Sequence, residues 1–512
     1  MGTVIGMKLL KLLLAGGLAV TGTVAVALPA SAVAGGTEAT QPYSFMVSVE
    51  EPESPRADKH GCGGELLAAQ WVLTASHCAQ TPNQAPVGTP RGWRVRVGSL
   101  SASSGGQVAD VDKFYRLAVN RSPGGMWGAD LALLHLTTPV SGTPISLAKA
   151  VPSVGAPVRF MGWGMTCEQS QPSCFPDKLR QADTVVQPDP KCSAGPVPGK
   201  EFCAGAADGS VAATNMDSGG PLVVQQDGRW VLAGTVDSGN DGQPTIYENV
   251  PVHADWITGI VSGKNVPPEV TQPSLAGEVS VNGCMGSVVR MPDARANDAA
   301  LLLTNGHCVQ GDRPAVGSAL VDQPAGFPIG IADHDGYDQA TANATRLVYA
   351  TMTGTDVALY RLDKTYAQFA AAHATVFTVS RKPMSANEKL AVLTGAYRES
   401  CTLSAVVPHL REGGYQLDDA VRTVGSEDCI LGPGMSGSAM VAPDGNTIVG
   451  VHNTSNQSTG AACSDGNPCE VGADGKVTSV PHAAYGEQID MIPGCFSGSV
   501  LQLNRYGCTL AK

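Results

Sequence analysis

The chain has 512 residues, of which 43% are hydrophobic and 15% are charged, with 61 glycines and 35 prolines. A chain of this length exceeds what one hydrophobic core usually supports, so two domains are expected, and the abundant glycine and proline favour many short strands joined by turns. The net charge of −12 argues against nucleic acid as a partner and offers no basic patch for an anionic membrane.

Residues 1–32 have the pattern of a secretory signal peptide. Lys8 and Lys11 precede an apolar run, and Ala30-Ser31-Ala32 forms a small-x-small cleavage site. A membrane anchor is the alternative, but glycines interrupt the run and a cleavage site ends it. We therefore expect a secreted, extracellular protein that has no stable association with the membrane after cleavage.

Three motifs with catalytic residue types follow in residues 33–261, the expected first domain. The first is Ala75-Ser76-His77-Cys78, which ends an apolar strand expected over residues 64–73 and preceded by another over 43–49. A lone histidine is more often a surface or core residue, but this context indicates a catalytic base. The second is Asp130, which leads into an apolar strand and has a strand-capping aspartate as its alternative interpretation. The third is Met216-Asp217-Ser218-Gly219-Gly220-Pro221.

These motifs resemble those of chymotrypsin-like serine endopeptidases, in the chain order His, Asp, Ser. The resemblance implies an all-β domain of two six-stranded barrels, in which Ser218 is the nucleophile, His77 the general base and Asp130 the residue that orients the base. The N–H groups of Met216 and Ser218 would form the oxyanion hole. Met216 departs from the family, which has glycine at that position.

The resemblance also concerns the amino terminus that cleavage after Ala32 would create. Val33-Ala34-Gly35-Gly36 is similar to the start of an activated protease of this family. It implies that the freed amino group of Val33 pairs with the buried carboxylate of Asp217, because a buried ion is costly without a partner.

The specificity pocket is placed by the same resemblance. Ala212 stands six residues before Ser218, where trypsin-like enzymes carry aspartate, which argues against cleavage after arginine or lysine. Gly239, in a turn expected over residues 237–239, and Thr245 would form the walls. Since Thr245 replaces a glycine, we expect small or medium apolar side chains before the cut.

The end of the first domain and the connection to the second can also be predicted. A short helix is expected over residues 252–261, closing the first domain, with His253 on its surface. Residues 262–275 have the proline-rich composition of a linker.

Residues 276–512, the expected second domain, repeat the three motifs in the same order. His307 precedes Cys308, Asp356 leads into an apolar strand, and Ser436 stands in a Gly-x-Ser-Gly string. The repeat resembles a second chymotrypsin-like barrel pair, nearer the bacterial Gly-x-Ser-Gly branch, with Gly434 and Ser436 as its oxyanion hole.

Two positions of the second domain differ from the first. Met435 occupies the place of Asp217, so this domain should need no terminal cleavage. His452 resembles the pocket histidine of glutamyl endopeptidases, which bind an acidic side chain, and a polar histidine at a strand end is the alternative.

The 14 cysteines, an even number in a secreted chain, favour disulfides over thiols or zinc. The resemblance supports the pairs Cys62–Cys78, Cys192–Cys203 and Cys284–Cys308. The others are expected to pair with neighbours in sequence: Cys167 with Cys174, Cys401 with Cys429, Cys463 with Cys469, and Cys495 with Cys508. Histidines outside the motifs are expected to be structural or to lie at the surface: His60, His135, His334, His373, His409 and His482.

The sequence therefore predicts a secreted serine endopeptidase that cuts polypeptide substrates through Ser-His-Asp acyl-enzyme catalysis, with two active sites and no cofactor or metal. A binding or adhesion protein in which one or both protease-like domains are catalytically degenerate is the alternative. An esterase with the same triad is a third possibility, but the chain order disfavours the usual esterase fold.

Overall fold

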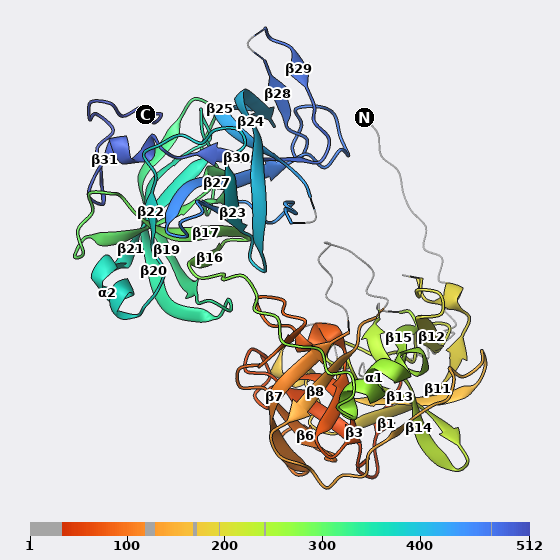
Figure 1. The fold of residues 1–512 in the computed structure, drawn as a ribbon. Coiled ribbons are helices and arrows are strands. Elements are labelled where there is room, and N and C mark those ends of the chain that lie inside the picture. The colour runs from red at the N-terminus through yellow and green to blue at the C-terminus, as the bar shows by residue number, and fades with distance from the viewer. Residues whose placement is uncertain are drawn as a thin grey trace, which may run out of the picture.

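The structure is a computed structural model that describes residues 33–117, 129–166, 171–193, 195–239, 242–426, 428–472 and 474–512. The expected signal peptide and Cys167 lie outside these residues. Strands dominate, and they form two bodies joined by one extended segment (Figure 1). Within the described ranges, no helix has the length and apolar character needed to cross a membrane.

The first domain contains two closed barrels of six strands each. In the first barrel the ladder runs β7-β6-β2-β3-β4-β8 and β8 returns to β7; in the second it runs β11-β10-β13-β14-β15-β12 and β12 returns to β11. The first barrel consists of β2 (Met46–Glu50), β3 (His60–Ala68), β4 (Trp71–Thr74), β6 (Arg94–Val97), β7 (Gln107–Arg116) and β8 (Ala132–Leu136). The second consists of β10 (Pro157–Gly162), β11 (Arg180–Gln187), β12 (Glu201–Gly205), β13 (Pro221–Gln226), β14 (Arg229–Ser238) and β15 (Thr245–Asn249).

Side chains fill the interior of these small barrels, as closure of six strands requires. Val47, Leu73 and Leu134, on three different strands, are each 0% exposed. Strands β2 and β4 are buried almost throughout, whereas β7 alternates between exposed and buried residues along its first half.

Three details differ from the sequence-based expectation. The strand expected over 64–73 is split into β3 and β4 by a turn, since the two halves pair antiparallel with Leu66 opposite Val72. The expected turn over 237–239 lies further on, because β14 continues through Ser238. The closing helix α1 (Ala254–Val261) begins two residues later than expected, after the 3-10 turn η4 (Val250–His253), and buries Ile257 and Ile260.

The second domain repeats the strand order of the first. Its first series, which matches the first barrel, runs β16 (Glu278–Val281), β17 (Cys284–Arg290), β18 (Ala299–Thr304), β21 (Val357–Thr365), β20 (Asp338–Thr351) and β19 (Ala319–Ala332). Its closed ring contains β23 (Lys389–Leu393), β24 (Arg398–Glu412), β25 (Tyr415–Val424), β26 (Ala439–Val441), β27 (Thr447–Ser455) and β30 (Ala483–Gln488).

The two halves of the second domain form one continuous sheet. β22 (Phe377–Val379) runs parallel to both β17 and β27 and joins them. Two backbone hydrogen bonds link the segment before β16 to the end of β19. Leu275 N donates to His334 O, 3.0 Å, and Gly277 N donates to Ala332 O, 3.0 Å. Figure 1 shows this domain in green to blue, with α2 (Tyr366–Ala371) at its edge.

The remaining elements are short. They are β1 (Thr37–Glu38), β5 (Val87–Gly88), β9 (Ser146–Leu147), β28 (Cys469–Val471), β29 (Val477–Thr478), β31 (Phe496–Ser497), β32 (Val500–Leu501) and the 3-10 turns η1 (Ser76–Ala79), η2 (Pro172–Cys174), η3 (Asp189–Lys191), η5 (Gly306–Cys308) and η6 (Ile492–Cys495). Phe496 and Leu510 are buried in the core of the second domain, so the chain end that the family resemblance did not cover packs onto the barrel.

Six disulfides join cysteines described here, and each links the neighbours that the sequence analysis paired. They are Cys62–Cys78, Cys192–Cys203, Cys284–Cys308, Cys401–Cys429, Cys463–Cys469 and Cys495–Cys508. Disulfides of this kind typically stabilise a small domain by about 2–4 kcal/mol each.

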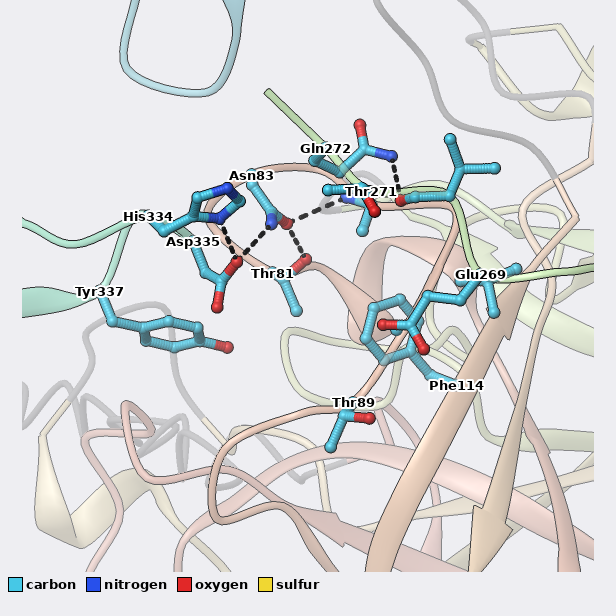
Figure 2. A pocket seen from close by; sticks show the side chains of 14 residues that line it. Thr81, Asn83, Thr89, Phe114, Glu269, Thr271, Gln272, His334, Asp335 and Tyr337 are labelled. Atoms are coloured by element: carbon cyan, nitrogen blue, oxygen red, sulfur yellow. Dashed lines mark hydrogen bonds and ion pairs between the residues drawn. The ribbon is translucent and has the colours of Figure 1, made fainter. Parts of the chain in front are cut away.

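The two domains touch through a loop of the second that meets the first near residues 81–91. Arg91 forms ion pairs with Asp333, 2.5 Å, and Asp335, 2.9 Å, and its guanidinium lies 4.2 Å from the ring centre of Tyr337. Asn83 contacts Asp335 at 3.5 Å, beside a cavity of about 210 Å³ lined by both domains (Figure 2). The segment 262–275, which contains no helix or strand, borders the same cavity.

Candidate active site

His77 and Asp130 meet at the edge of the first barrel. β4 pairs with β8, so that Thr74 lies opposite Ala132 and the residues flanking the two strands come together. The Nδ1 atom of His77 lies 2.6 Å from Oδ2 of Asp130, and the backbone N–H of His77 donates to Oδ1 at 2.8 Å. Both contacts fix the imidazole against a carboxylate that is 0% exposed.

The loop that carries Ser218 is fastened to both barrels. The carbonyl of Ser218 accepts a hydrogen bond from Gly63 N in β3, 2.8 Å, and Gly219 N donates to Val236 O in β14, 2.8 Å. Gly219 has a φ of +74°, and a Cβ there would lie 2.7 Å from the carbonyl oxygen of Gly63. Only glycine fits this position, so the loop passes between the barrels with the serine half-buried.

The second domain builds the same arrangement. Nδ1 of His307 lies 2.7 Å from Oδ2 of Asp356, and the N–H of His307 donates to Oδ1 at 3.0 Å. The carbonyl of Ser436 accepts from Met285 N at 2.7 Å, and its hydroxyl donates to the carbonyl of Asn453 at 2.8 Å. A cleft of about 320 Å³ contains His307, Asp356, Gly434 and Ser436 in its lining.

Comparisons with known proteins match both domains of the chain. The Trypsin family matches residues 33–257, and the trypsin-like peptidase domain family matches residues 285–451. Serine protease 41 of Homo sapiens is 32% identical over 242 residues, which covers 42% of this chain and 73% of that protein. The chain belongs to the trypsin-like serine protease family. Snake venom serine proteinase 4a of Crotalus adamanteus is 30% identical over 247 residues, covering 45% of this chain and 88% of that protein. The solved structure of neuropsin, a serine protease expressed in the limbic system of mouse brain, has 26% identity and a TM-score of 0.36, covering 44% of this chain and 98% of that one.

The histidine of each candidate site has a raised pKa. Burial lowers the pKa of His77, but its hydrogen bond to Asp130 and the charges of Asp130 and Glu51 outweigh this, so the pKa is raised. Burial also lowers the pKa of His307, but the charge of Asp356 and its hydrogen bond to the imidazole outweigh burial, so this pKa is raised as well. In each case the paired aspartate lies where it would stabilise the imidazolium that proton transfer would form.

The expected oxyanion residues of this family share one backbone conformation. Met216 has a φ of +73° and Gly434 a φ of +83°. Glycine takes such angles freely, whereas a residue with a side chain is destabilised by about 1–2 kcal/mol. His60 supports the strained residue: it is 0% exposed, its Nε2 lies 3.1 Å from the carbonyl of Met216, and its Nδ1 lies 2.7 Å from Ser48 Oγ. His60 is therefore structural.

Asp217 and Val33 are both fully buried in the first domain. The carboxylate of Asp217 accepts hydrogen bonds from Gly164 N, 2.7 Å, and Thr214 N, 2.9 Å. Burial raises its pKa to about 6. Next to Val33, Ala34 N donates to Ala212 O at 2.9 Å, so the segment that begins with Val33 runs into the same domain interior.

The three residues expected in the first specificity pocket lie close together. Thr245 Oγ1 accepts from Ala213 N at 2.8 Å, beside Ala212. A Cβ on Gly239 would lie 3.7 Å from the same hydroxyl oxygen. Thr245 and Ala212 are buried, and no carboxylate occurs at Ala212 to receive a basic side chain.

The expected pocket histidine of the second domain lies behind the cleft. His452 is 1% exposed and is absent from the residues that line the cleft. Burial lowers its pKa to about 4, despite contacts with the backbone of Gly432 and Tyr485. A neutral, enclosed imidazole fits the strand-end alternative better than the acid-binding one.

Sequence reasoning missed a group of buried acids and misplaced one histidine. His253 was expected at the surface, and this is wrong: it is 7% exposed, and its Nε2 lies 3.5 Å from Oε2 of Glu248. The missed acids are Glu201, Asp237 and Glu248, which lie on three strands around Asp130. The available signal was an acidic residue next to apolar residues in each of the three strands.

Proposed function

We propose that the chain is a secreted serine endopeptidase with two Ser-His-Asp active sites, one in residues 33–261 and one in 276–512, joined by a linker over 262–275. The observation that carries the proposal is the repeated geometry: in each domain a buried aspartate binds a histidine through two contacts, and a serine loop is hydrogen-bonded to both barrels. The extracellular location is supported by the six disulfides.

The proposed reaction follows from the roles of these groups. Ser218 or Ser436 attacks the peptide carbonyl while His77 or His307 takes the hydroxyl proton and then delivers it to the leaving amine. Asp130 or Asp356 stabilises the imidazolium. The N–H groups of residues 216 and 218, or of 434 and 436, bind the oxyanion, and losing one such donor typically slows catalysis about 100–1,000-fold. Water then hydrolyses the acyl ester.

Labelling with a fluorophosphonate, followed by peptide mapping, tests the proposal. We expect modification of Ser218 and Ser436 and of no serine outside these loops. S218A and S436A should each remove one modification and retain the other. Absence of modification at both serines, in folded protein that begins at Val33, would leave the binding-protein alternative.

We also propose that removal of residues 1–32 activates the first site through an ion pair between the Val33 amino group and Asp217. The burial of both residues supports this. Protein carrying extra residues before Val33 should label at Ser436 and not at Ser218. Equal labelling of Ser218 in the extended and mature proteins would contradict the ion pair.

The first site is proposed to prefer small or medium apolar residues before the cut, since Ala212 provides no charge and Thr245 fills space. A peptide library presented to S436A protein tests this preference. Dominant cleavage after arginine or lysine would overturn it.

A further inference from the structure

Three further carboxyl groups lie around Asp130 in the first domain. Asp237, next to last in β14, brings a carboxyl oxygen to within 4.8 Å of ligand atoms of His77 and Asp130. Glu201 of β12 and Glu248 of β15 are ladder partners, and their oxygens lie within 4.8 Å of Asp237 as well. All four acids are at most 8% exposed.

This cluster has two imidazoles and four acids. His77 on η1 contacts Asp130, and His253 on η4 lies 3.5 Å from Oε2 of Glu248. That oxygen has no hydrogen-bond partner among the described residues, while Oε1 accepts from the N–H of Asp130. Burying four ionised carboxylates so close together would be very costly, so the cluster must hold a proton or a bound cation.

Asp237 is the member best placed to hold the proton. Two ionised carboxylates are acceptors only, so they cannot share a hydrogen bond without a proton between them. Asp130 accepts two hydrogen bonds from His77, which stabilises its ionised form. Burial, then the charge of Asp130 and a side-chain hydrogen bond with it, and then the charges of Glu201 and Glu248, raise the pKa of Asp237 to about 9.

The second domain holds a neutral donor at the matching position. Gly219 N donates to Val236 O, and Gly437 N donates to His452 O, so the residues that follow, Asp237 and Asn453, correspond. The side-chain amide of Asn453 donates to Glu487 Oε1 at 2.8 Å.

The other two acids are also matched or replaced. Glu487 lies opposite Val451 as Glu248 lies opposite Thr235. Ala420, 0% exposed on β25, stands where the first domain has Glu201. The second site thus keeps one of the three additional acids and pairs it with an amide.

We infer that Asp237 is a positioning residue of the first site, which is protonated at neutral pH and donates a hydrogen bond to the carboxylate of Asp130. When hydroxide removes that proton, a second negative charge develops beside Asp130. Repulsion then displaces Asp130 from His77, and the orientation of the base is lost. In the second site Asn453 does not ionise, and the remaining acid, Glu487, has a pKa that burial and the charge of Asp356 raise only to about 7, so no proton should be lost there in the alkaline range.

The inference rests on the proposed role of Ser218, and the test separates the two. Mature full-length protein is labelled with a fluorophosphonate from pH 7 to pH 10, and the rate constants at Ser218 and Ser436 are measured in the same sample. The variants are D237N, which keeps a neutral donor, and N453D, which installs an acid in the second site. D112N, an exposed acid of the first domain that pairs with His135, is the matched control.

The ratio of the Ser218 rates in D237N and in the natural protein should rise as the pH increases above neutral, by about tenfold per pH unit once the pH exceeds the raised pKa of Asp237. Loss of the Val33 ammonium affects both proteins equally and cancels in this ratio. N453D should add an alkaline decline at Ser436, and D112N should add none.

A ratio that stays flat with pH overturns the inference and leaves the proposed function intact. Ser218 labelling that is lost in a chelator and restored by Ca²⁺ also overturns it, because a cation would then hold the cluster together. Absence of Ser218 labelling at every pH contradicts the proposed function itself. If D237N does not fold, N453D decides: an unaltered pH profile at Ser436 counts against the inference.

Discussion

The two nucleophile loops share one backbone pattern and differ at the two residues that precede the serine. Gly220 N donates to Asp217 O, 2.9 Å, as Ser438 N donates to Met435 O, 3.1 Å. The first loop has a strained methionine at the oxyanion position and an aspartate before the serine; the second has glycine and methionine. The hydrogen bonds that position the serine therefore depend on main-chain atoms. The side chains at the two preceding positions can differ between the domains without changing these bonds.

The largest expected effect tests whether each site depends on its own pair of histidine and aspartate. Asp130→Asn should slow labelling of Ser218 about 10,000-fold and leave Ser436 labelling in place, and Asp356→Asn should do the reverse, because the wrong tautomer of the histidine is then favoured. Rate constants at each serine, measured by mass spectrometry, check this. Slowing of both serines by one substitution would mean that the sites are coupled.

Asp217→Asn tests the first difference between the loops. Breaking a buried ion pair costs about 3–5 kcal/mol, so mature protein should lose at least about a hundredfold in Ser218 labelling. Ser436 in the same molecule is the control, since Met435 gives the second loop no such pair. Retention of the Ser218 rate would remove the proposed role of the Val33 amino group.

The acid side of the pH profile should be common to both sites. A base must be neutral to accept a proton, so each rate falls as pH drops through the pKa of its histidine. Because the pKa values of His77 and His307 are raised, the midpoints should lie above about 6.5, the usual histidine value, with the rate falling about tenfold per pH unit below them. A midpoint below 6.5 at either serine would contradict the stabilisation by aspartate.

The backbone strain of the oxyanion position predicts reciprocal changes in stability. Met216→Gly should stabilise the first domain, and Gly434→Ala should destabilise the second, each by about 1 kcal/mol. A Cβ at Gly434 would meet nothing within 4 Å. The substitution therefore measures only the free-energy cost of the positive φ, with no steric clash added. Denaturant unfolding of each variant measures the change. No loss of stability in Gly434→Ala would show that the positive φ is not retained.

The smallest expected effect concerns the contact between the domains. Arg91→Ala removes exposed ion pairs, which are worth at most about 1 kcal/mol. Protease cleavage within residues 262–275 should become several-fold faster. Arg346→Ala, which removes an exposed pair with Asp322 inside the second domain, serves as the control and should have no such effect.

The candidate site residues that could be predicted from the sequence are those that stand in continuous strings. His77, Asp130 and Ser218 each lie in a motif of adjacent residues, and the repeated order located their counterparts. Barrels and neighbouring disulfide partners followed from short apolar strands and cysteine order. The carboxyl cluster was missed because its acids come from separate strands, and only barrel closure brings them together. His253 was misplaced for the same reason: its burial depends on contact with β15.

The contact of Arg91 with the second domain matters because a short segment of the same chain connects the two domains. Residues 262–275 form a short, proline-rich and therefore semi-rigid connection, which keeps the two domains close together. The contact can therefore open without separating the two domains. Small changes at Arg91 are thus expected to shift the balance between a closed and an open arrangement of the two domains.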